Sequence, residues 1–351
     1  MIAALVAAVA IALPLPDAPG WRVPAPTTRD DTAWLQQRLD EGGTTYLPRL
    51  PGDECYRTSG LWISHDDTAL VSDGACVVAT GSGPVRLTLG TDAVAADALL
   101  YVNRTNAQTR APAHVTIAGL RLFVPRAVRM FGMEIQAHDV EIANVEVDGS
   151  PKDALLVDGR GTEDGSSSGV WIHDSRFRAG GRNVVSVTSA RDVRIERCEI
   201  SGASDTAYLP ETHRSHGNPS AGIDLEPDQP GSPALGITIA DNSIAANAGA
   251  GIIVSLNPRN RPALLADGIT IAGNSIVANG RKPTPPVRGG IVLSGGRGGH
   301  VEIADNVISR NRGFGLSGGT AMIVDAHGNT FRGNSAGAWH FRRLGRGSRI
   351  R

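Results

Sequence analysis

Two acidic residues, Asp224 and Glu226, lie two positions apart in a short, otherwise apolar stretch. If this stretch is a β-strand, its alternate residues face opposite sides, so both carboxylates share one exposed face while Ile223 and Leu225 point inward. The strand rise places the two Cα atoms roughly 6.5–7 Å apart. Glycosidic hydrolysis uses two carboxyl groups about 5–5.5 Å apart for retention and roughly 6.5–9.5 Å apart for inversion. The pair therefore suits acid/base chemistry on a sugar without fixing its stereochemistry.

The same oxygens suit a hard cation. Ca²⁺ binds carboxylates, and Asp158 on a neighbouring repeat is a candidate third ligand beside Asp224 and Glu226. Calcium is thus an alternative use of the pair, and no other cofactor is indicated. A plainer alternative is that the acids are simply solvated side chains on the outer face of a strand.

A polar insertion, residues 201–220, leads into this strand and interrupts a regular pattern. It contains His213 and His216. We predict these as further catalytic residues because two nearby acids favour the protonated form of an imidazole, which can donate a proton. Arg214, in the same insertion, is predicted to bind substrate. Exposed loop residues without a catalytic role are the alternative.

Short strands repeat along the chain from residue 115. One type has inward Ile residues separated by 25, 30, 23, 44, 32 and 32 positions: Ile117, Ile142, Ile172, Ile195, Ile239, Ile271 and Ile303. A second type is centred on Glu134, Leu156, Ser186, Asp224, Ile253, Val292 and Gly315. The shortest period, 23 residues, is the length of one solenoid coil, and longer periods add loops to it. About eight coils at ~4.8 Å give a solenoid roughly 40 Å long.

Asn residues recur at fixed positions after the first strand type. They form two columns, Asn242, Asn274, Asn306 and Asn329, and Asn247, Asn279, Asn311 and Asn334. Stacked Asn side chains can repeat the same hydrogen bonds from coil to coil, so we predict Asn ladders at two corners.

Aligning the second strand type predicts one outward face with polar residues near Asp224 and apolar ones beyond it, at Ile253 and Val292. Charge is therefore not the default on this face. The polar neighbours predicted to bind substrate are Asp158, Arg182, Ser186, Thr188, Arg214 and Ser255.

The N-terminal residues predict a helix over 28–41, with Trp34, Leu35 and Leu39 as its apolar stripe and Gly42 as its stop. Segments 30–36 (Asp-Asp-Thr-Ala-Trp-Leu-Gln) and 42–48 (Gly-Gly-Thr-Thr-Tyr-Leu-Pro) resemble the N-terminal cap of pectate-lyase-like proteins. Together with the repeats, this resemblance covers nearly the whole chain. It implies an all-β, right-handed, single-stranded parallel β-helix with an N-terminal capping helix, and a groove on one sheet that holds polysaccharide.

The resemblance does not supply catalytic residues. The polygalacturonase branch carries Asn-Thr-Asp, Asp-Asp, Gly-His-Gly and Arg-Ile-Lys in order, and these do not occur in that arrangement here. Pectate lyases of this fold use a basic residue as proton abstractor. Only Lys152 and Lys282 are lysines, so that base would be Arg or His.

The organisation predicted is a signal peptide at 1–18, a cap with the first coils at 19–114, β-helix repeats at 115–341 and a basic tail at 342–351. Cys55 and Cys76 are predicted to form a disulfide, and Cys198 to be a buried free thiol. A net charge of −1 argues against nucleic-acid and membrane partners. We expect a secreted monomer, extracellular or periplasmic.

These observations predict a secreted carbohydrate-active enzyme, a polysaccharide lyase or glycoside hydrolase, with Asp224 and Glu226 as acid/base or cation-holding carboxylates. The alternative is a non-catalytic glycan-binding or adhesin-like β-helix.

Overall fold

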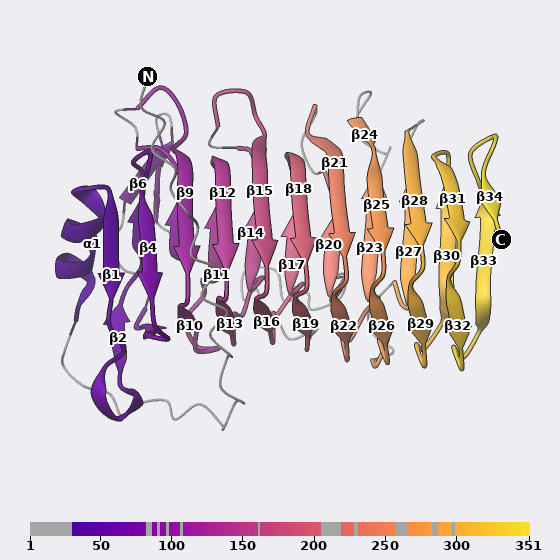
Figure 1. The fold of residues 1–351 in the computed structure, drawn as a ribbon, viewed down its shortest axis with the longest axis horizontal. Helices are drawn as coiled ribbons and strands as arrows, with labels where there is room; N and C mark the ends of the chain where they lie inside the picture. Colours follow the sequence, from indigo (N-terminus) through magenta and orange to yellow (C-terminus); the bar gives the residue numbers. More distant parts are fainter. Residues whose placement is uncertain are drawn as a thin grey trace, which may run out of the picture.

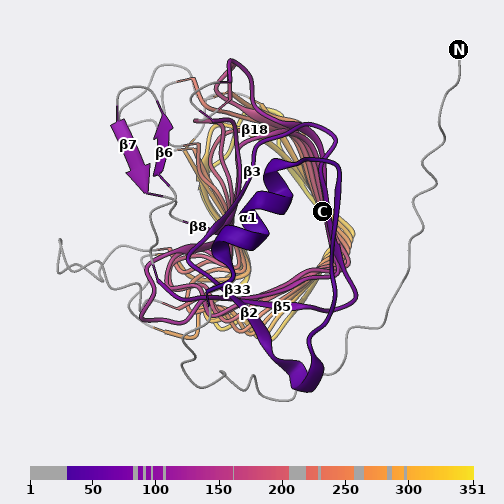
Figure 2. The same cartoon turned by 90° about the vertical axis from the view of Figure 1, so that its left-hand side faces the viewer.

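The chain winds into a right-handed solenoid of three long parallel sheets, as the sequence predicts (Figure 1). The computed structural model describes residues 30–81, 86–89, 92–95, 98–105, 108–160, 162–204, 219–227, 231–256, 265–282, 287–295 and 299–351. Seen along the solenoid, the three sheets enclose a common interior and the helix α1 (Thr32–Asp40) lies across its N-terminal end (Figure 2). Each regular coil adds one strand to each sheet in turn, here called sheets A, B and C.

Sheet A contains twelve strands. They are β1 (Thr44–Leu47), β4 (Ala69–Ser72), β9 (Ala113–Ala118), β12 (His138–Ala143), β15 (Ser167–His173), β18 (Ala190–Glu196), β21 (Pro233–Ala240), β24 (Leu265–Asp267), β25 (Ile269–Ala272), β28 (His300–Ala304), β31 (Ile323–His327) and β34 (Arg349–Ile350).

Sheet B contains ten strands, preceded by the 3₁₀ turn Pro51–Asp53. They are β2 (Cys55–Thr58), β5 (Cys76–Ala79), β10 (Arg121–Phe123), β13 (Glu146–Asp148), β16 (Arg176–Arg178), β19 (Glu199–Ser201), β22 (Ser243–Ala245), β26 (Ser275–Val277), β29 (Val307–Ser309) and β32 (Thr330–Arg332).

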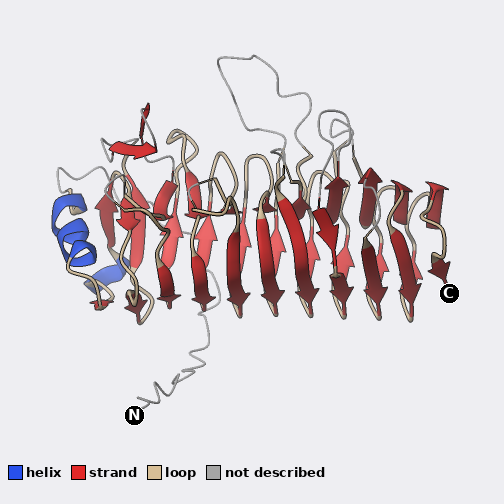
Figure 3. Cartoon of the chain, turned by 90° about the horizontal axis from the view of Figure 1, so that it is seen from above, coloured by secondary structure: helices blue, strands red, loops and turns tan. Residues whose placement is uncertain are grey.

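Sheet C also contains ten strands, and a separate hairpin is formed by β6 (Arg86–Leu89) and β7 (Asp92–Ala95). The strands of sheet C are β3 (Leu61–Ile63), β8 (Ala98–Val102), β11 (Phe131–Ile135), β14 (Leu155–Val157), β17 (Val185–Val187), β20 (Ile223–Leu225), β23 (Ile252–Leu256), β27 (Ile291–Gly295), β30 (Phe314–Thr320) and β33 (Gly337–Arg343). Figure 3 shows the strands succeeding one another along the solenoid, with the helix at one end.

The interior is a continuous apolar core in which inward residues stack coil on coil. In sheet A, Ile142 pairs with Ile172, which pairs with Ile195, as the repeats predict. In sheet C, Ile223 and Leu225 are fully buried between β17 and β23. Burying alternate residues of every strand leaves the other half outward, so register alone decides which side chains can contact a ligand.

The last aligned repeat differs from its prediction. The sequence alignment placed Phe314 opposite Ile291, whereas Leu316 occupies that position in the sheet. A shift of two residues preserves the alternation of inward and outward side chains, so periodicity cannot detect it. Phe314 instead stacks on His340, with ring centroids 5.0 Å apart.

Both Asn columns form ladders, as predicted. Asn279 is buried and donates from Nδ2 to Asn311 Oδ1 at 3.0 Å and to the Ile244 carbonyl at 3.1 Å. Its own Oδ1 accepts from Asn247 Nδ2 and from the Asn247 amide. The column at Asn242 repeats this geometry through Asn274, Asn306 and Asn329. Each corner in these ladders except the last is therefore held by the coil that follows it.

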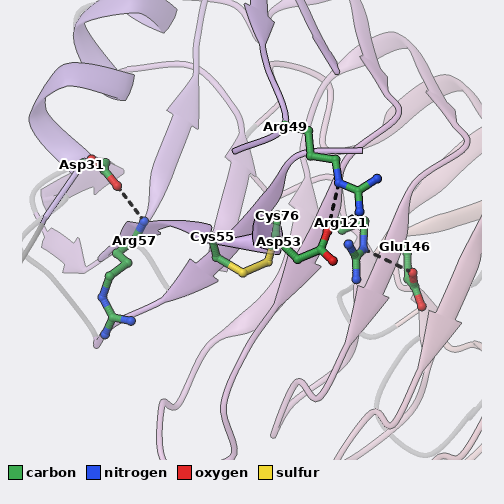
Figure 4. Close-up of a disulfide and its surroundings, with 8 residues drawn as sticks. All are labelled: Asp31, Arg49, Asp53, Cys55, Arg57, Cys76, Arg121 and Glu146. Carbon is green, nitrogen blue, oxygen red and sulfur yellow. Dashed lines mark hydrogen bonds and ion pairs between the residues drawn. A yellow bond between two sulfur atoms is a disulfide. The ribbon is translucent and has the colours of Figure 1, made fainter. Parts of the chain in front are cut away.

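The N-terminal cap is attached to the first coil at several points. Leu35 and Leu39 of α1 enter the core, and Trp34 stacks on Tyr56 at 6.1 Å. Figure 4 shows Asp31, which accepts a hydrogen bond from the Arg57 amide, beside the disulfide between Cys55 and Cys76. Cys55 and Cys76 occupy paired positions on β2 and β5, so the disulfide links neighbouring strands.

The C-terminal segment continues the solenoid. Arg349–Ile350 of the predicted tail forms β34 and pairs with β31. Trp339, on the last strand of sheet C, is 52% exposed. The described helix is too short and too polar to cross a membrane.

The register predicts unequal effects of one charge on two faces. Replacing Ile223 by Asp buries an unpaired carboxylate and should lower the free energy of unfolding by several kcal/mol, on the order of 4. Thr238→Asp, half-exposed on sheet A between Arg194 and Thr270, should change it by less than about 0.5 kcal/mol. Chemical denaturation measures both, and equal values would contradict the register.

The ladders predict a position-dependent cost for losing an Asn. Asn279→Ala leaves the Asn247 amide and Nδ2 without an acceptor inside the solenoid, and should destabilise the protein by about 2–4 kcal/mol. Asn329→Ala, at the half-exposed end of the other ladder, should cost less because water can replace the lost bonds. Thermal denaturation of the two variants measures both effects. A larger fall in Tm for Asn329→Ala than for Asn279→Ala would contradict burial as the reason for the cost.

Candidate functional site

The predicted carboxylate pair lies on the outer face of sheet C, where the sequence placed it. Asp224 on β20 is directly between Ser186 on β17 and Ile253 on β23. Glu226 immediately follows β20, and its amide bonds to the Val187 carbonyl at 3.0 Å. Along the sheet the outward positions equivalent to Asp224 are, in order, Trp62, Tyr101, Glu134, Leu156, Ser186, Ile253, Val292, Ser317 and His340.

Asp224 is not exposed, and here the structure corrects the expectation of an open face. Only 1% of the residue is accessible, because neighbouring strands and Asn183, from the turn before β17, pack around it. Asp224 Oδ2 accepts a hydrogen bond from Asn183 Nδ2 at 2.9 Å. The other oxygen, Oδ1, is buried and has no hydrogen-bond partner in the described part of the chain. Glu226 is half-buried.

The surroundings favour a protonated Asp224. Burial raises the pKa of this carboxyl well above its usual value, and the nearby charge of Glu226 raises it further. The positive charge of Arg182 and the hydrogen bond from Asn183 act in the opposite direction but are outweighed. The two carboxyls therefore differ in environment, which is the condition under which one can serve as an acid and the other as a base.

Asn183 is held in place by a second buried acid, Asp153. The Asn183 backbone N–H donates to Asp153 Oδ1 at 2.9 Å, and Asn183 Oδ1 accepts from the Ala221 backbone N–H at 3.0 Å. Arg182 forms a two-pronged ion pair with Asp153, through Nε at 2.9 Å and through Nη2. This pairing raises the pKa of Arg182, so the guanidinium keeps its charge beside Asp224.

Sequence reasoning predicted Arg182 but missed Asp153 and Asn183. Both lie two positions before the first inward residue of a sheet C strand, a column that reads Phe131, Asp153, Asn183, Ala221, Ala250 and Gly289. Only two members of that column are polar, and this contrast is the signal that would have identified them.

Of the other predicted residues, Ser186 belongs to the site and accepts from Asn183 Nδ2 at 3.1 Å. Thr188 lies between Asp158 and Glu226 in the next outward file, and Ser255 is on the following strand. Asp158 is two strands from Asp224 and buried. Its carboxylate is occupied by Arg160, Thr188 and the Gly159 amide.

In the part of the chain that the structure describes, no three His, Cys, Asp or Glu side chains lie close enough together to hold a metal ion such as calcium. His213, Arg214 and His216 lie in 205–218, outside the described residues. The free thiol of Cys198 is buried, and burial raises its pKa to about 12.

A second buried polar group on sheet C was not predicted as a unit. Gln136 donates to Glu134 at 2.5 Å, and Asn103 donates to Gln136 and to the Tyr101 hydroxyl, both at 3.0 Å. Burial and the charge of Glu134 raise the pKa of Tyr101. The N-terminal half of this face thus carries buried polar groups, whereas Ile253 beyond Asp224 belongs to an apolar cluster with Ala221 and Ala250.

Comparisons with known proteins agree with this architecture. Residues 131–343 match the family model of the right-handed beta helix region. The curated protein sequences contain no match.

Solved structures with similar folds share little sequence. An alginate lyase from Paenibacillus sp. str. FPU-7 superposes with a TM-score of 0.53 at 14% identity, over 89% of this chain and 96% of its own. Tailspike protein 2 from Escherichia coli O157:H7 bacteriophage CAB120 gives a TM-score of 0.53 at 11% identity, over 90% of this chain and 40% of its own. The Dettilon tailspike protein gives 0.50 at 11% identity, over 90% and 66%. This chain thus spans less than half of the first tailspike.

Such identities show a shared fold and leave the site to be judged by its own residues. The three parallel sheets and the family match over 131–343 together establish that this chain belongs to the right-handed β-helix family.

Proposed function

We propose that this chain is a secreted carbohydrate-active enzyme that cleaves or modifies a polysaccharide on the outer face of sheet C. Asp224 and Glu226 are its carboxyl pair. Arg182, Asn183 and Asp153 position Asp224 and set its charge.

One observation carries the proposal. A fully buried carboxyl with one oxygen lacking a partner among the described residues stands in a file where the next two coils have Ile253 and Val292. Burying such a group without full hydrogen bonding costs stability, and the scaffold evidently accepts apolar residues at this position. The presence of an acid at this position is therefore best explained by a chemical role.

The chemistry follows from the unequal environments. Its raised pKa makes Asp224 the member of the pair suited to hold a proton and to donate it to the oxygen of a departing sugar. Glu226, which is half-buried and two residues further along the chain, is the base or nucleophile of the pair. His213 and His216 are proposed as additional proton carriers. In the alternative use of the pair, oxygens of Asp224, Glu226 and Asp158 would hold calcium.

The shared fold supports a polymeric substrate. The alginate lyase that matches at a TM-score of 0.53 acts, by its name, on a polysaccharide. A parallel sheet that continues for ten strands offers an extended face to a chain of sugars.

The burial of Asp224 favours a second candidate, a non-catalytic glycan-binding or adhesin-like β-helix. With only 1% of the residue accessible, a sugar would reach its carboxyl only after local opening. In this case polysaccharide binds and leaves unchanged.

The assay that separates the two candidates is incubation with plant, algal and bacterial polysaccharides, with and without a chelator. Enzymatic cleavage appears as new reducing ends or as unsaturated-uronate absorbance. Asp224→Asn and Glu226→Gln should each lower the rate by about 100-fold or more, as expected for loss of a general acid or base. Asp192→Asn, exposed on sheet A, is the matched control and should retain activity. Full activity in both site variants would refute the assignment.

The raised pKa of Asp224 also predicts a pH-dependent stability difference. Because the folded state holds this proton more tightly than the unfolded chain, ionisation costs stability as pH rises from about 4 through the folded-state pKa. Asp224→Asn lacks that penalty, so its Tm relative to wild type should increase between pH 4 and pH 8. Differential scanning calorimetry checks this, with Asp192→Asn as control. A difference that stays constant with pH would mean that Asp224 is ionised throughout.

A further inference from the structure

A pocket of about 320 Å³ opens at the corner between sheets B and C, outside the Asp224 site. It is formed by turns of successive coils, because the Gly181 amide bonds to the Ser150 carbonyl at 2.7 Å and the Ser204 amide to the Gly180 carbonyl at 2.8 Å. The wall is closely packed: a Cβ at Gly181 would lie 2.1 Å from the Pro151 carbonyl oxygen. Its volume falls at the lower end of the range for small-ligand sites, about 300–1,000 Å³.

The lining of this corner pocket is positively charged. Arg126 and Arg129 contribute exposed guanidinium groups, and its lining includes no acidic residue. Arg126 has no acidic partner within the described ranges, whereas Arg129 already makes an interaction inside them. On the adjoining coil, Lys152 lies 4.7 Å from the Phe131 ring centroid, adding a further cation to this corner. A guanidinium group beside a small cavity presents planar, paired N–H donors that match an anionic oxygen group.

The pocket is connected to the Asp224 site by a three-residue segment. Gly181 lines the pocket, Arg182 pairs with Asp153, and Asn183 bonds to Asp224. A sugar polymer on the outer face of sheet C that passes over this turn would bring a neighbouring residue to the corner. Both sites therefore lie within reach of one oligosaccharide.

We infer that the corner pocket is a subsite for an anionic substituent, a carboxylate or a sulfate, on the polymer bound at sheet C. This inference rests on the proposed function, since it assigns the class of substrate for the same face. Arg126 and Arg129 are its binding residues. Recognition by two arginines predicts that charged polysaccharides bind more tightly than neutral ones, and that salt weakens their binding.

Binding is measured by calorimetry on the full chain with polygalacturonate, alginate, dextran sulfate and neutral dextran, at low and physiological salt. At least one anionic polymer should bind more tightly than dextran, and the uronate and sulfate arms identify the substituent. Arg126→Gln combined with Arg129→Gln should weaken that binding tenfold or more. Both side chains are exposed, so the variant should keep the wild-type Tm.

The matched control is Arg310→Gln combined with Arg332→Gln. These exposed arginines are on neighbouring coils elsewhere on the surface, and replacing them removes the same total charge. Their loss should change binding less than twofold. Equal losses in the two double variants, unchanged binding in the Arg126/Arg129 variant, or no preference for any anionic polymer would each overturn the inference.

Failure of the subsite and failure of the enzyme are distinguishable. Asp224→Asn should lower turnover by about 100-fold or more while leaving the affinity for the anionic polymer within about twofold of wild type. If turnover survives in Asp224→Asn but affinity falls in the Arg126/Arg129 variant, the catalytic proposal is wrong and the subsite stands. The reverse pattern removes the subsite and keeps the enzyme.

Discussion

Coil-on-coil register is the constraint on which the rest of this molecule depends. Each strand pairs in parallel with the same strand of the next coil, so equivalent residues from successive coils align in files. Inward files form one apolar core, and a shift by a single residue would bury the polar half of every strand. The Asn ladders reinforce this register, because each buried Asn bonds to its equivalent in the following coil.

The same register makes departures from the repeat informative. Outward positions lie outside the solenoid core, and other coils have Ile253, Val292 or Ser317 at the position of Asp224. A residue that is costly at such a position is explained by something other than the fold. Asp224 is buried, lacks a partner for Oδ1 among the described residues, and is held by Asn183.

The support for Asp224 illustrates how a solenoid builds a site from residues far apart in the chain. Asp153, Asn183 and Asp224 come from three successive coils, up to 71 positions apart, yet form one chain of contacts. Arg182 supplies a nearby positive charge that is already paired with Asp153, and its lowering of the Asp224 pKa is outweighed by burial and by the charge of Glu226. The corner pocket uses the same turns and adds Arg126 and Arg129.

The sequence by itself determined the solenoid, the inward files, both Asn ladders and the outward position of Asp224, because each of these repeats with a period that can be read from residue types. It also indicated that Cys55 and Cys76 would pair, as they do across β2 and β5. A two-residue shift at Phe314 escaped notice because alternation is unchanged by it. Only the tertiary structure decided that Asp224 is buried, that Asp153 and Asn183 hold it, and that Arg126 and Arg129 share a pocket. Those features depend on how the turns that vary from coil to coil fold against the sheet edge, and these turns, unlike the Asn corners, do not follow the repeat.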